Sequence, residues 1–224
     1  MTMRIIGKLK AVIFDLDGVI LDSMSGHAAA WLETFAEAGF AVDEAYIYQN
    51  EGMLDLERLS ILAGDGRVFD RDFFDRLLSR QRDIYLGKFS SAVGIYPRAG
   101  RLVERLSAAG LALALVTSSS RQVLSPELRA WLDQYFDQVV TGDQVARTKP
   151  HPDPYLQALA GLGVDRTEAV VVENAPAGIE AAKAAGLTCL ALTTTLPPAN
   201  LGRADLVVGD HEDLRVWLEP YISG

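Results

Sequence analysis

The sequence is poor in cysteine, histidine and basic residues. Its 224 residues include one cysteine, Cys189, and three histidines, so it predicts neither a disulfide nor a cluster of Cys and His metal ligands. A single cysteine in an apolar run is usually a small buried hydrophobe, so we expect a reducing, cytoplasmic compartment. Lys and Arg number 21 against 30 Asp and Glu, a formal net charge of −9. This balance argues against nucleic acid or an anionic membrane as the partner.

Long apolar runs are also absent. No run is long enough to span a bilayer, and the opening MTMRIIGKLKAVIFD lacks the pattern of a secretory signal peptide. We therefore expect no membrane partner. Hydrophobic residues make up 49% of the chain, which is ample for a core. The length suggests one large domain or a core with an insertion, and we expect a monomer or a weak dimer.

Short apolar runs alternate with helix-like segments along most of the chain. The runs are rich in Val and Leu and rarely alternate with polar residues, as expected of parallel strands covered on both faces. In SPELRAWLDQYF, Ser125 stands at an N-cap and Pro126 at the first helical position, a typical helix start. This order predicts an α/β fold, a doubly wound parallel sheet with a Rossmann-like core. The expected strands are KAVIFD, LALALVTS, DQVVTG, EAVVVEN, TCLALTT and ADLVVG.

A helical stretch interrupts this alternation between the first two expected strands. Residues 22–91 have helical patterns throughout and are too many for a simple crossover. We expect them to form a helical cap domain, inserted into a core made of residues 1–21 and 92–224. Such a cap should move as a body, hinged near residues 21–23 and 91–97, and should exclude water when it closes.

Polar residues follow several of the expected strands. The carboxyl ends of parallel strands share one edge of the sheet, where ligands bind. Carboxylate and amide oxygens without a His or Cys cluster suit Mg²⁺, and a lysine suits a phosphate group. One aspartate could attack phosphorus while a second transfers protons. The residues concerned are Asp15, Asp17, Thr117, Ser118, Lys149, Glu173 and Asn174.

Four motifs resemble those of the haloacid dehalogenase superfamily of phosphatases. They are DLDGVILDS, LVTSSS, TKPHPDPY and VVVENAPAGIEAAKAAG, and together they cover nearly the whole chain. Each motif alone would be weak, but all four in this order are a specific match. The segment 22–91 resembles the helical cap of this family, and HAAAW near its start resembles the β-phosphoglucomutase-like branch.

The resemblance implies a Mg²⁺-dependent phosphatase that hydrolyses a small, sugar-phosphate-like metabolite through an aspartyl-phosphate. It also implies a role for each matching residue. By this resemblance Asp15 is the nucleophile and a metal ligand, and Asp17 is the general acid and base, which also binds the metal through its carbonyl. Thr117 and Ser118 hold the phosphoryl group, and Lys149 steadies the nucleophile and the phosphate. Glu173 and Asn174 complete the metal site.

The sequence departs from the family pattern at two places. Asn174 stands where the family usually has a second acid, which implies weaker metal binding or a contact through water. The phosphomutases of the family carry a Gly-x-Ser-Arg loop in the cap, where this chain reads NEGMLDLE. This difference favours a phosphatase over a β-phosphoglucomutase-like mutase. A non-catalytic phosphate-binding or phosphoacceptor module is the alternative of another class, but such modules are smaller and lack the cap.

Some polar residues of the cap segment have simpler structural interpretations. We expect Asp22 and Ser23 to cap the first cap helix rather than to act in catalysis. His27 is expected to be a packed or hinge residue rather than a catalyst. Arg80 and Arg82 are expected on a solvated helix face, with the alternative that one of them faces the cleft and reads the substrate.

Overall fold

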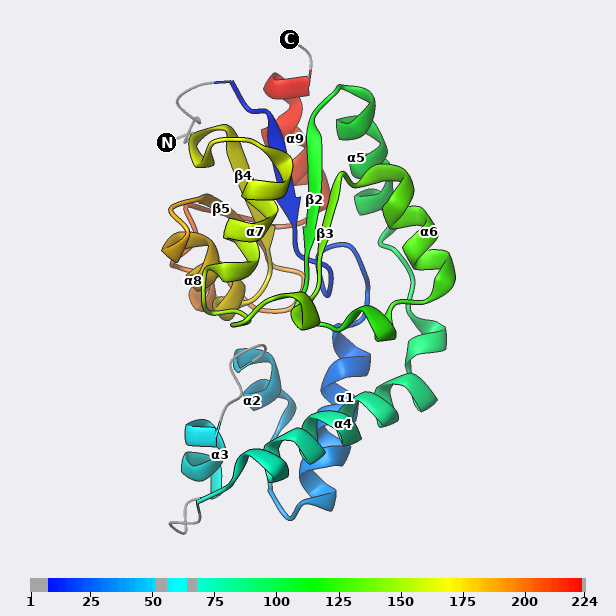
Figure 1. The fold of residues 1–224 in the computed structure, drawn as a ribbon, viewed down its shortest axis with the longest axis vertical. Helices are drawn as coiled ribbons and strands as arrows, with labels where there is room; N and C mark the ends of the chain where they lie inside the picture. Colours follow the sequence, from blue (N-terminus) through cyan, green and yellow to red (C-terminus); the bar gives the residue numbers. More distant parts are fainter. Residues whose placement is uncertain (1–7, 51–55, 64–67, 223–224) are drawn as a thin grey trace.

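The computed structural model describes residues 8–50, 56–63 and 68–222. This part of the chain contains one six-stranded parallel sheet in the order β3-β2-β1-β4-β5-β6, shown in Figure 1. The predicted α/β class and doubly wound core are confirmed, and each apolar run named above contains one strand. The strands are β1 (Ala11–Phe14), β2 (Ala112–Val116), β3 (Gln138–Val140), β4 (Ala169–Glu173), β5 (Thr188–Leu192) and β6 (Leu206–Val208).

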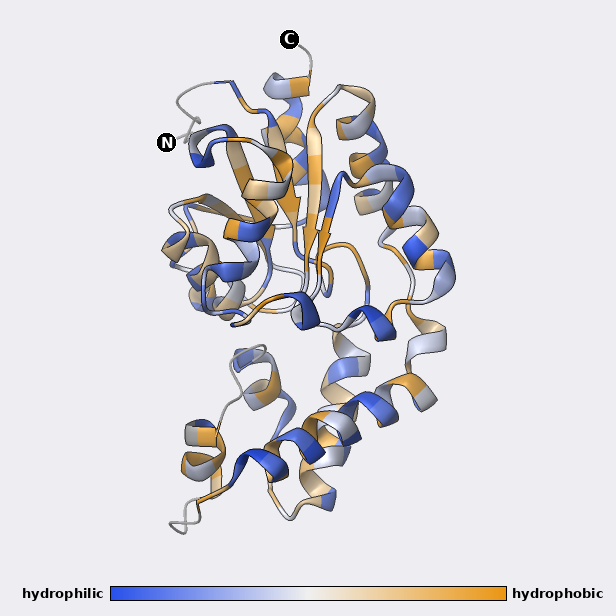
Figure 2. Cartoon of the chain, in the orientation of Figure 1, coloured by the Kyte–Doolittle hydropathy of each residue, from blue (hydrophilic) through white to orange (hydrophobic). Residues whose placement is uncertain are grey.

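Helices cover both faces of the sheet. Val12 and Phe14 of β1 belong to a cluster formed with α5 (Pro97–Ala108), α6 (Pro126–Tyr135) and α9 (His211–Ile222). Ala11 and Ile13 point to the opposite face, against α7 (Asp153–Leu162) and α8 (Pro176–Ala184). Figure 2 shows the strands as largely hydrophobic. Both faces of each central strand are therefore buried, which explains why its sequence is apolar without alternation.

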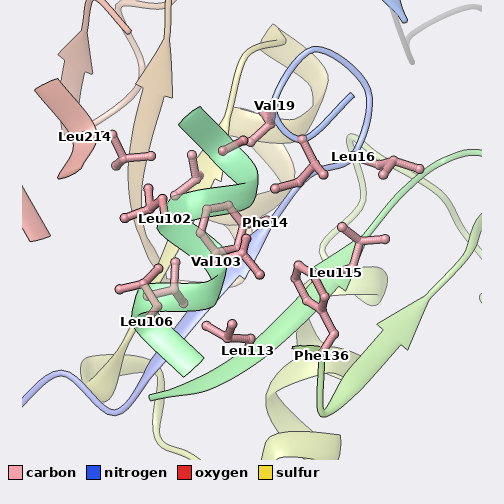
Figure 3. Close-up of a cluster of buried hydrophobic side chains, with 14 of the residues drawn as sticks. Phe14, Leu16, Val19, Leu102, Val103, Leu106, Leu113, Leu115, Phe136 and Leu214 are labelled. Carbon is pink, nitrogen blue, oxygen red and sulfur yellow. The ribbon is translucent and has the colours of Figure 1, made fainter. Parts of the chain in front are cut away.

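The larger cluster holds the sheet to α5. Leu102, Val103 and Leu106 recur at helical spacing and lie against Phe14 in Figure 3. Phe14 also meets Phe136 edge to face, with ring centroids 6.2 Å apart. Burying one such side chain contributes roughly 1.5–3 kcal/mol. This packing fixes β1, and with it the two aspartates that follow.

Local sequence signals set the helix ends of the core. The Ser125 hydroxyl accepts a hydrogen bond from the N–H of Leu128 at 3.1 Å, and Pro126 is the first residue of α6. The expected N-cap is therefore confirmed. After α8 the chain turns at Gly186, whose φ of +75° is a conformation that glycine adopts readily.

In the described residues between β1 and α5, four α-helices lie together below the sheet in Figure 1, and we call them the helical body. They are α1 (Met24–Glu37), α2 (Glu44–Gln49), α3 (Leu56–Ala63) and α4 (Arg71–Lys88). Phe35, Phe40 and Leu77 belong to the hydrophobic cluster of this body, which is distinct from the clusters of the sheet. None of the helices in the described ranges is long and apolar enough to cross a membrane.

The two connections between this helical body and the sheet run side by side. Leu21 and Ile95 form an antiparallel bridge, and the N–H of Asp22 donates to the carbonyl of Gly94 at 3.0 Å. The Asp22 carboxylate accepts a hydrogen bond from the hydroxyl of Tyr96 at 3.0 Å. It therefore joins the two connections and caps no helix, contrary to our expectation. The division of the chain at residues 22 and 91, and a hinge there, stay predictions.

Candidate active site

The predicted site residues gather at the carboxyl edge of the sheet. β1 lies between β2 and β4 in the strand order, so the residues that follow these strands are neighbours in space. Asp15 and Asp17 follow β1, Thr117 follows β2, and Glu173 ends β4. Lys149 comes from the loop between β3 and α7. These residues line a cleft of ≈ 800 Å³ between the sheet edge and helices α1 and α4.

Lys149 joins two buried carboxylates. Its Nζ lies 2.5 Å from Oδ1 of Asp15 and 2.7 Å from Oε1 of Glu173, and it donates to the carbonyl of Val116 at 3.1 Å. The side chain is 5% exposed. Burial alone would lower the pKa of Lys149, but the Asp15 and Glu173 carboxylates raise it above its usual range. Lys149 is therefore a fixed ammonium group at the strand ends.

Both oxygens of Glu173 already accept hydrogen bonds. Oε1 accepts from Lys149 and from the hydroxyl of Tyr155 at 2.6 Å, and Oε2 accepts from the N–H groups of Asn174 and Ala175 at 3.0 and 3.3 Å. The Glu173 carboxylate thus helps to hold the Lys149 ammonium against Asp15. A Cβ at Gly178 would lie 1.6 Å from Oε1, so only glycine leaves room for Glu173 here. Direct metal binding by Glu173 stays a prediction.

Sequence reasoning missed Tyr155. The residue lies on α7, six positions after Lys149 in TKPHPDPY, and its side chain is fully buried. Burial and the charge of Glu173 raise the pKa of Tyr155 well above its usual range, so the hydroxyl keeps its proton and donates. The only available signal was an aromatic residue with a polar tip close to a predicted site lysine.

The site carries more negative than positive charge. Burial raises the pKa of Asp15 to about 8, the Lys149 ammonium opposes this shift, and the carboxylates of Glu173 and Asp17 add to it. Asp15 and Glu173 therefore share one lysine, and the Asp17 carboxylate lies near them without contacting it. Such a cluster is stabilised by a further cation.

Asp17 accepts hydrogen bonds on both carboxylate oxygens. Oδ1 accepts from Ser23 at 2.7 Å and lies 3.2 Å from Nε2 of His27, and Oδ2 accepts from Ser119 at 3.1 Å. Burial alone would raise the pKa of Asp17, but His27, Ser23 and Ser119 lower it to about 2. Asp17 is therefore ionised at neutral pH. The Thr117 hydroxyl also lies 3.4 Å from Oδ2.

The expected helix cap at Ser23 was wrong. Ser23 occupies the N-cap position of α1, but its side chain makes no capping hydrogen bond. The hydroxyl donates instead to the Asp17 carboxylate, and a hydrogen bond to a charged acceptor is stronger than one between two neutral groups. His27 stacks on Tyr85, as a packed residue would, with ring centroids 3.8 Å apart. Its contact with Asp17 was not foreseen.

The loop after β2 contributes Ser119 to the site in addition to the predicted Thr117 and Ser118. Thr117 accepts from the N–H of Ser119 at 3.0 Å, and Ser119, rather than Ser118, bonds Asp17. Ser118 lines the cleft. A Cβ at Gly142 would lie 2.2 Å from the carbonyl oxygen of Ser118, so Gly142 allows the loops after β2 and β3 to approach each other. The phosphate-holding roles of Thr117 and Ser118 stay predictions.

Asn174 presents an oxygen that suits a cation. Its Nδ2 donates to the hydroxyl of Thr195 at 2.8 Å, which fixes the amide. Its Oδ1 is buried and has no hydrogen-bond partner within the described part of the chain. Buried amide oxygens are rarely left unpaired. A Cβ at Gly18 would lie 2.1 Å from Nδ2 of Asn174, so Gly18 lets the loop after Asp17 pass directly against this amide.

The donors at this point fit Mg²⁺ rather than a transition metal. Among the described residues, no group of three or more His, Cys, Asp or Glu side chains is placed to hold a metal ion. The oxygens predicted to hold a metal are mixed: the Asp15 carboxylate, the Asp17 carbonyl and Oδ1 of Asn174, the last of which is buried without a partner in the described ranges. One carboxylate with neutral oxygens, completed by water and substrate phosphate, is typical of Mg²⁺ sites.

The cap wall of the cleft is aromatic and cationic. Trp31 and Phe35 of α1 stack with ring centroids 5.2 Å apart and line the cleft together with Phe74 and Tyr85 of α4. Arg82 also lines the cleft. Arg80 instead binds Glu37 through two hydrogen bonds of 2.7 Å outside the cleft. Of the two arginines, Arg82 therefore faces the cleft.

Comparison with known proteins agrees with this geometry. A family model described as haloacid dehalogenase-like hydrolase matches residues 12–192. The chain belongs to this family. The resemblance identified from the four motifs is confirmed, and with it the hydrolase class.

Two of the curated relatives match over nearly their whole length, and a third is much longer than this chain. Validoxylamine A 7'-phosphate phosphatase of Streptomyces hygroscopicus subsp. limoneus is 31% identical, over 96% of this chain and 98% of the relative. Hexitol phosphatase A of Escherichia coli is 30% identical, over 95% and 96%. The SUPPRESSOR OF QUENCHING 1 protein of Arabidopsis thaliana is 35% identical over 87% of this chain, which spans 19% of that protein.

A solved structure shares the fold. A hydrolase from Pseudomonas syringae superposes with a TM-score of 0.84 at 27% identity, covering 94% of this chain and 98% of that one. The core and the helical body are both included in such an overlap. The present chain therefore shares the fold of the Pseudomonas syringae hydrolase over 94% of its length.

Proposed function

We propose that this hydrolase is a Mg²⁺-dependent phosphatase that acts on a small phosphorylated metabolite, such as a sugar phosphate, through an aspartyl-phosphate on Asp15. The observation that carries the proposal is the Lys149 ammonium, held 2.5 Å from Asp15 in the lining of the cleft. A fixed cation beside a nucleophilic carboxylate is what attack on a phosphate dianion requires. Two phosphatases that match over nearly their whole length support it.

In the first half-reaction the carboxylate of Asp15 attacks phosphorus and the bond to the leaving oxygen breaks. Lys149 holds Oδ1 of Asp15 and offsets charge on the phosphoryl oxygens, while Thr117 and Ser118 bind those oxygens. Asp15, the Asp17 carbonyl and Oδ1 of Asn174 would hold Mg²⁺, which supplies positive charge to the phosphate when bound. Asp17 gives a proton to the leaving oxygen.

In the second half-reaction Asp17 takes a proton from water, which attacks phosphorus and frees Asp15. The hydrogen bonds from Ser23, His27 and Ser119 keep Asp17 as a carboxylate, the form that this step needs. For the preceding acid step Asp17 must hold a proton. An incoming phosphate favours that proton, because a nearby negative charge raises the pKa of a carboxyl group.

The cap loop bears on the choice between phosphatase and mutase. NEGMLDLE spans residues 50–57, of which 51–55 lie outside the described residues. At its start, Asn50 lines the cleft and accepts a hydrogen bond from Arg58 at 2.7 Å. The sequence of this loop still lacks the Ser-Arg pair of the mutases, so we favour transfer of the phosphoryl group to water.

A panel of phosphorylated metabolites, assayed with Mg²⁺ and with EDTA, tests this function. We expect release of inorganic phosphate from at least one sugar or polyol phosphate, and its loss in EDTA. A mutase would isomerise a sugar phosphate without net phosphate release, which would overturn the hydrolytic step. A non-catalytic module would bind phosphate without turnover on any substrate of the panel.

A further inference from the structure

His27 lies between the proposed acid and base, Asp17, and helix α4. Its Nε2 is 3.2 Å from Oδ1 of Asp17, and its Nδ1 is 3.4 Å from Nε2 of Gln81. Tyr85, one turn further along α4, stacks on the imidazole with the ring planes 9° apart. Gln81 is buried and also lines the cleft. These contacts connect α4 of the helical body to the loop after β1.

The hydrogen-bond pattern determines which imidazole nitrogen carries the proton. A neutral imidazole has one N–H donor and one acceptor nitrogen. If the Gln81 amide N–H donates to Nδ1, the proton of His27 is on Nε2 and points at Asp17. The opposite amide orientation would place an oxygen against Nδ1. A neutral His27 would then turn an unprotonated Nε2 toward a carboxylate, which only accepts.

We propose that Gln81 is a positioning residue, which holds His27 as the Nε2–H tautomer and thereby keeps an N–H donor on Asp17. The ring stacking of Tyr85 fixes the plane of the imidazole, and Gln81 fixes its proton. The helical body thus sets the hydrogen bonding of a core carboxylate through one glutamine. The inference rests on the proposed function only for the role of Asp17, because the tautomer itself is independent of catalysis.

Nuclear magnetic resonance tests the tautomer without substrate or metal. Long-range ¹H–¹⁵N spectra distinguish the two neutral tautomers and the imidazolium, and the chain has three histidines, His27, His151 and His211. We expect an Nε2–H pattern for His27 in the native protein. Gln81→Glu replaces the donor by an acceptor and should add a proton at Nδ1. An Nδ1–H pattern in the native protein, or an unchanged His27 spectrum in Gln81→Glu, would overturn the proposal.

Steady-state kinetics then test whether the tautomer of His27 affects the proposed proton transfer by Asp17. Gln81→Met keeps the length of the side chain and removes the donor. We expect kcat to fall roughly tenfold on a metabolite with a poor leaving group, because small misplacements of catalytic groups are costly. The loss should be smaller on nitrophenyl phosphate, and KM should stay nearly constant. Ser79→Ala, on the same helix but outside the cleft, is the control and should change neither constant.

The two measurements separate the possible failures. If no metabolite is hydrolysed, the proposed function fails, and the His27 spectra still decide the tautomer. If the spectra change as expected but kcat of Gln81→Met equals that of the native enzyme, the positioning role is wrong. An equal loss on good and poor leaving groups would likewise remove the link to Asp17. Thermal unfolding of each variant, with Ser79→Ala beside it, identifies a loss that comes from folding.

Discussion

Nζ of Lys149 lies 2.5 Å from Oδ1 of Asp15, although the two residues are 134 positions apart in the sequence. The strand order creates this contact, because β1 is placed beside β2 and β4 and the loop before α7 crosses their ends. Removing two charges from water is costly, and a buried ion pair is weak evidence of stability. Its position in the lining of the cleft instead indicates a functional reason for keeping it.

Replacement of Asp15 by Asn should abolish turnover and leave the fold intact. The amide cannot attack phosphorus. Asn keeps the shape of Asp, and its amide oxygen can still accept a hydrogen bond from Lys149, so thermal unfolding in EDTA should show a folded variant. Residual activity above about 1% of the native level would argue against a nucleophile, because such losses typically span several decades. Mass spectrometry should find phosphate on the native Asp15 peptide.

Tyr155→Phe tests whether the Tyr155 hydroxyl, through its hydrogen bond to Glu173, helps to position Lys149. The variant removes the hydroxyl that donates to Glu173 at 2.6 Å, leaving a buried carboxylate with one donor fewer. Loss of a buried hydrogen bond of this kind costs about 1–3 kcal/mol in the free energy of unfolding, measurable by urea denaturation. We expect kcat to fall roughly threefold to tenfold as Lys149 loses its fixed position. Tyr135→Phe on α6 is the control, and equal stability of both variants would contradict this role.

Arg82 should contribute to substrate binding, and Arg80 should not. Arg82 lines the cleft, and its Nε lies 3.9 Å from the carboxylate of the neighbouring Asp83, a loose pairing that a substrate group can replace. Arg80 is held by Glu37 outside the cleft. Arg82→Ala should raise KM for the preferred metabolite roughly fivefold to tenfold, since the side chain is partly exposed. Equal KM values for Arg82→Ala and Arg80→Ala would exclude this role.

Patterns that are local in sequence predicted the core well. Buried parallel strands produce apolar runs, and a polar residue that ends such a run falls at the ligand-binding edge wherever the strand lies in the sheet. Asp15, Asp17, Thr117 and Glu173 could therefore be placed together without knowing the strand order. Lys149 could be added because it follows the run DQVVTG by a few residues, and the motif TKPHPDPY then gave it a role.

Contacts that depend on how helices are placed were not predictable. Tyr155, Ser119, Thr195 and the contact of His27 with Asp17 arise where separate elements meet, and each residue has an ordinary local sequence around it. Ser23 shows the converse error. Ser23 does occupy the N-cap position that we predicted. Its hydroxyl, however, donates a hydrogen bond to the Asp17 carboxylate and does not cap the helix.

Asn174→Asp should tighten Mg²⁺ binding in the absence of substrate. Oδ1 of Asn174 is buried without a partner in the described ranges of the chain, while Nδ2 donates to the hydroxyl of Thr195. A carboxylate at this position can accept a hydrogen bond from the same hydroxyl, so the substitution keeps that contact with donor and acceptor exchanged. The added charge should strengthen binding by about 1–2 kcal/mol, after desolvation cancels much of the Coulomb attraction.

Calorimetric titration of Mg²⁺ into both proteins, without phosphate, measures this difference. Asn200→Asp, on an exposed turn, adds the same charge away from the cleft and controls for the net charge of the chain. The gain should shrink when inorganic phosphate is present, because phosphate oxygens then supply negative charge to the cation. Equal affinities of Asn174→Asp and Asn200→Asp would mean that Oδ1 of Asn174 does not face the metal. Its unpaired oxygen would then need a bound water molecule to satisfy it.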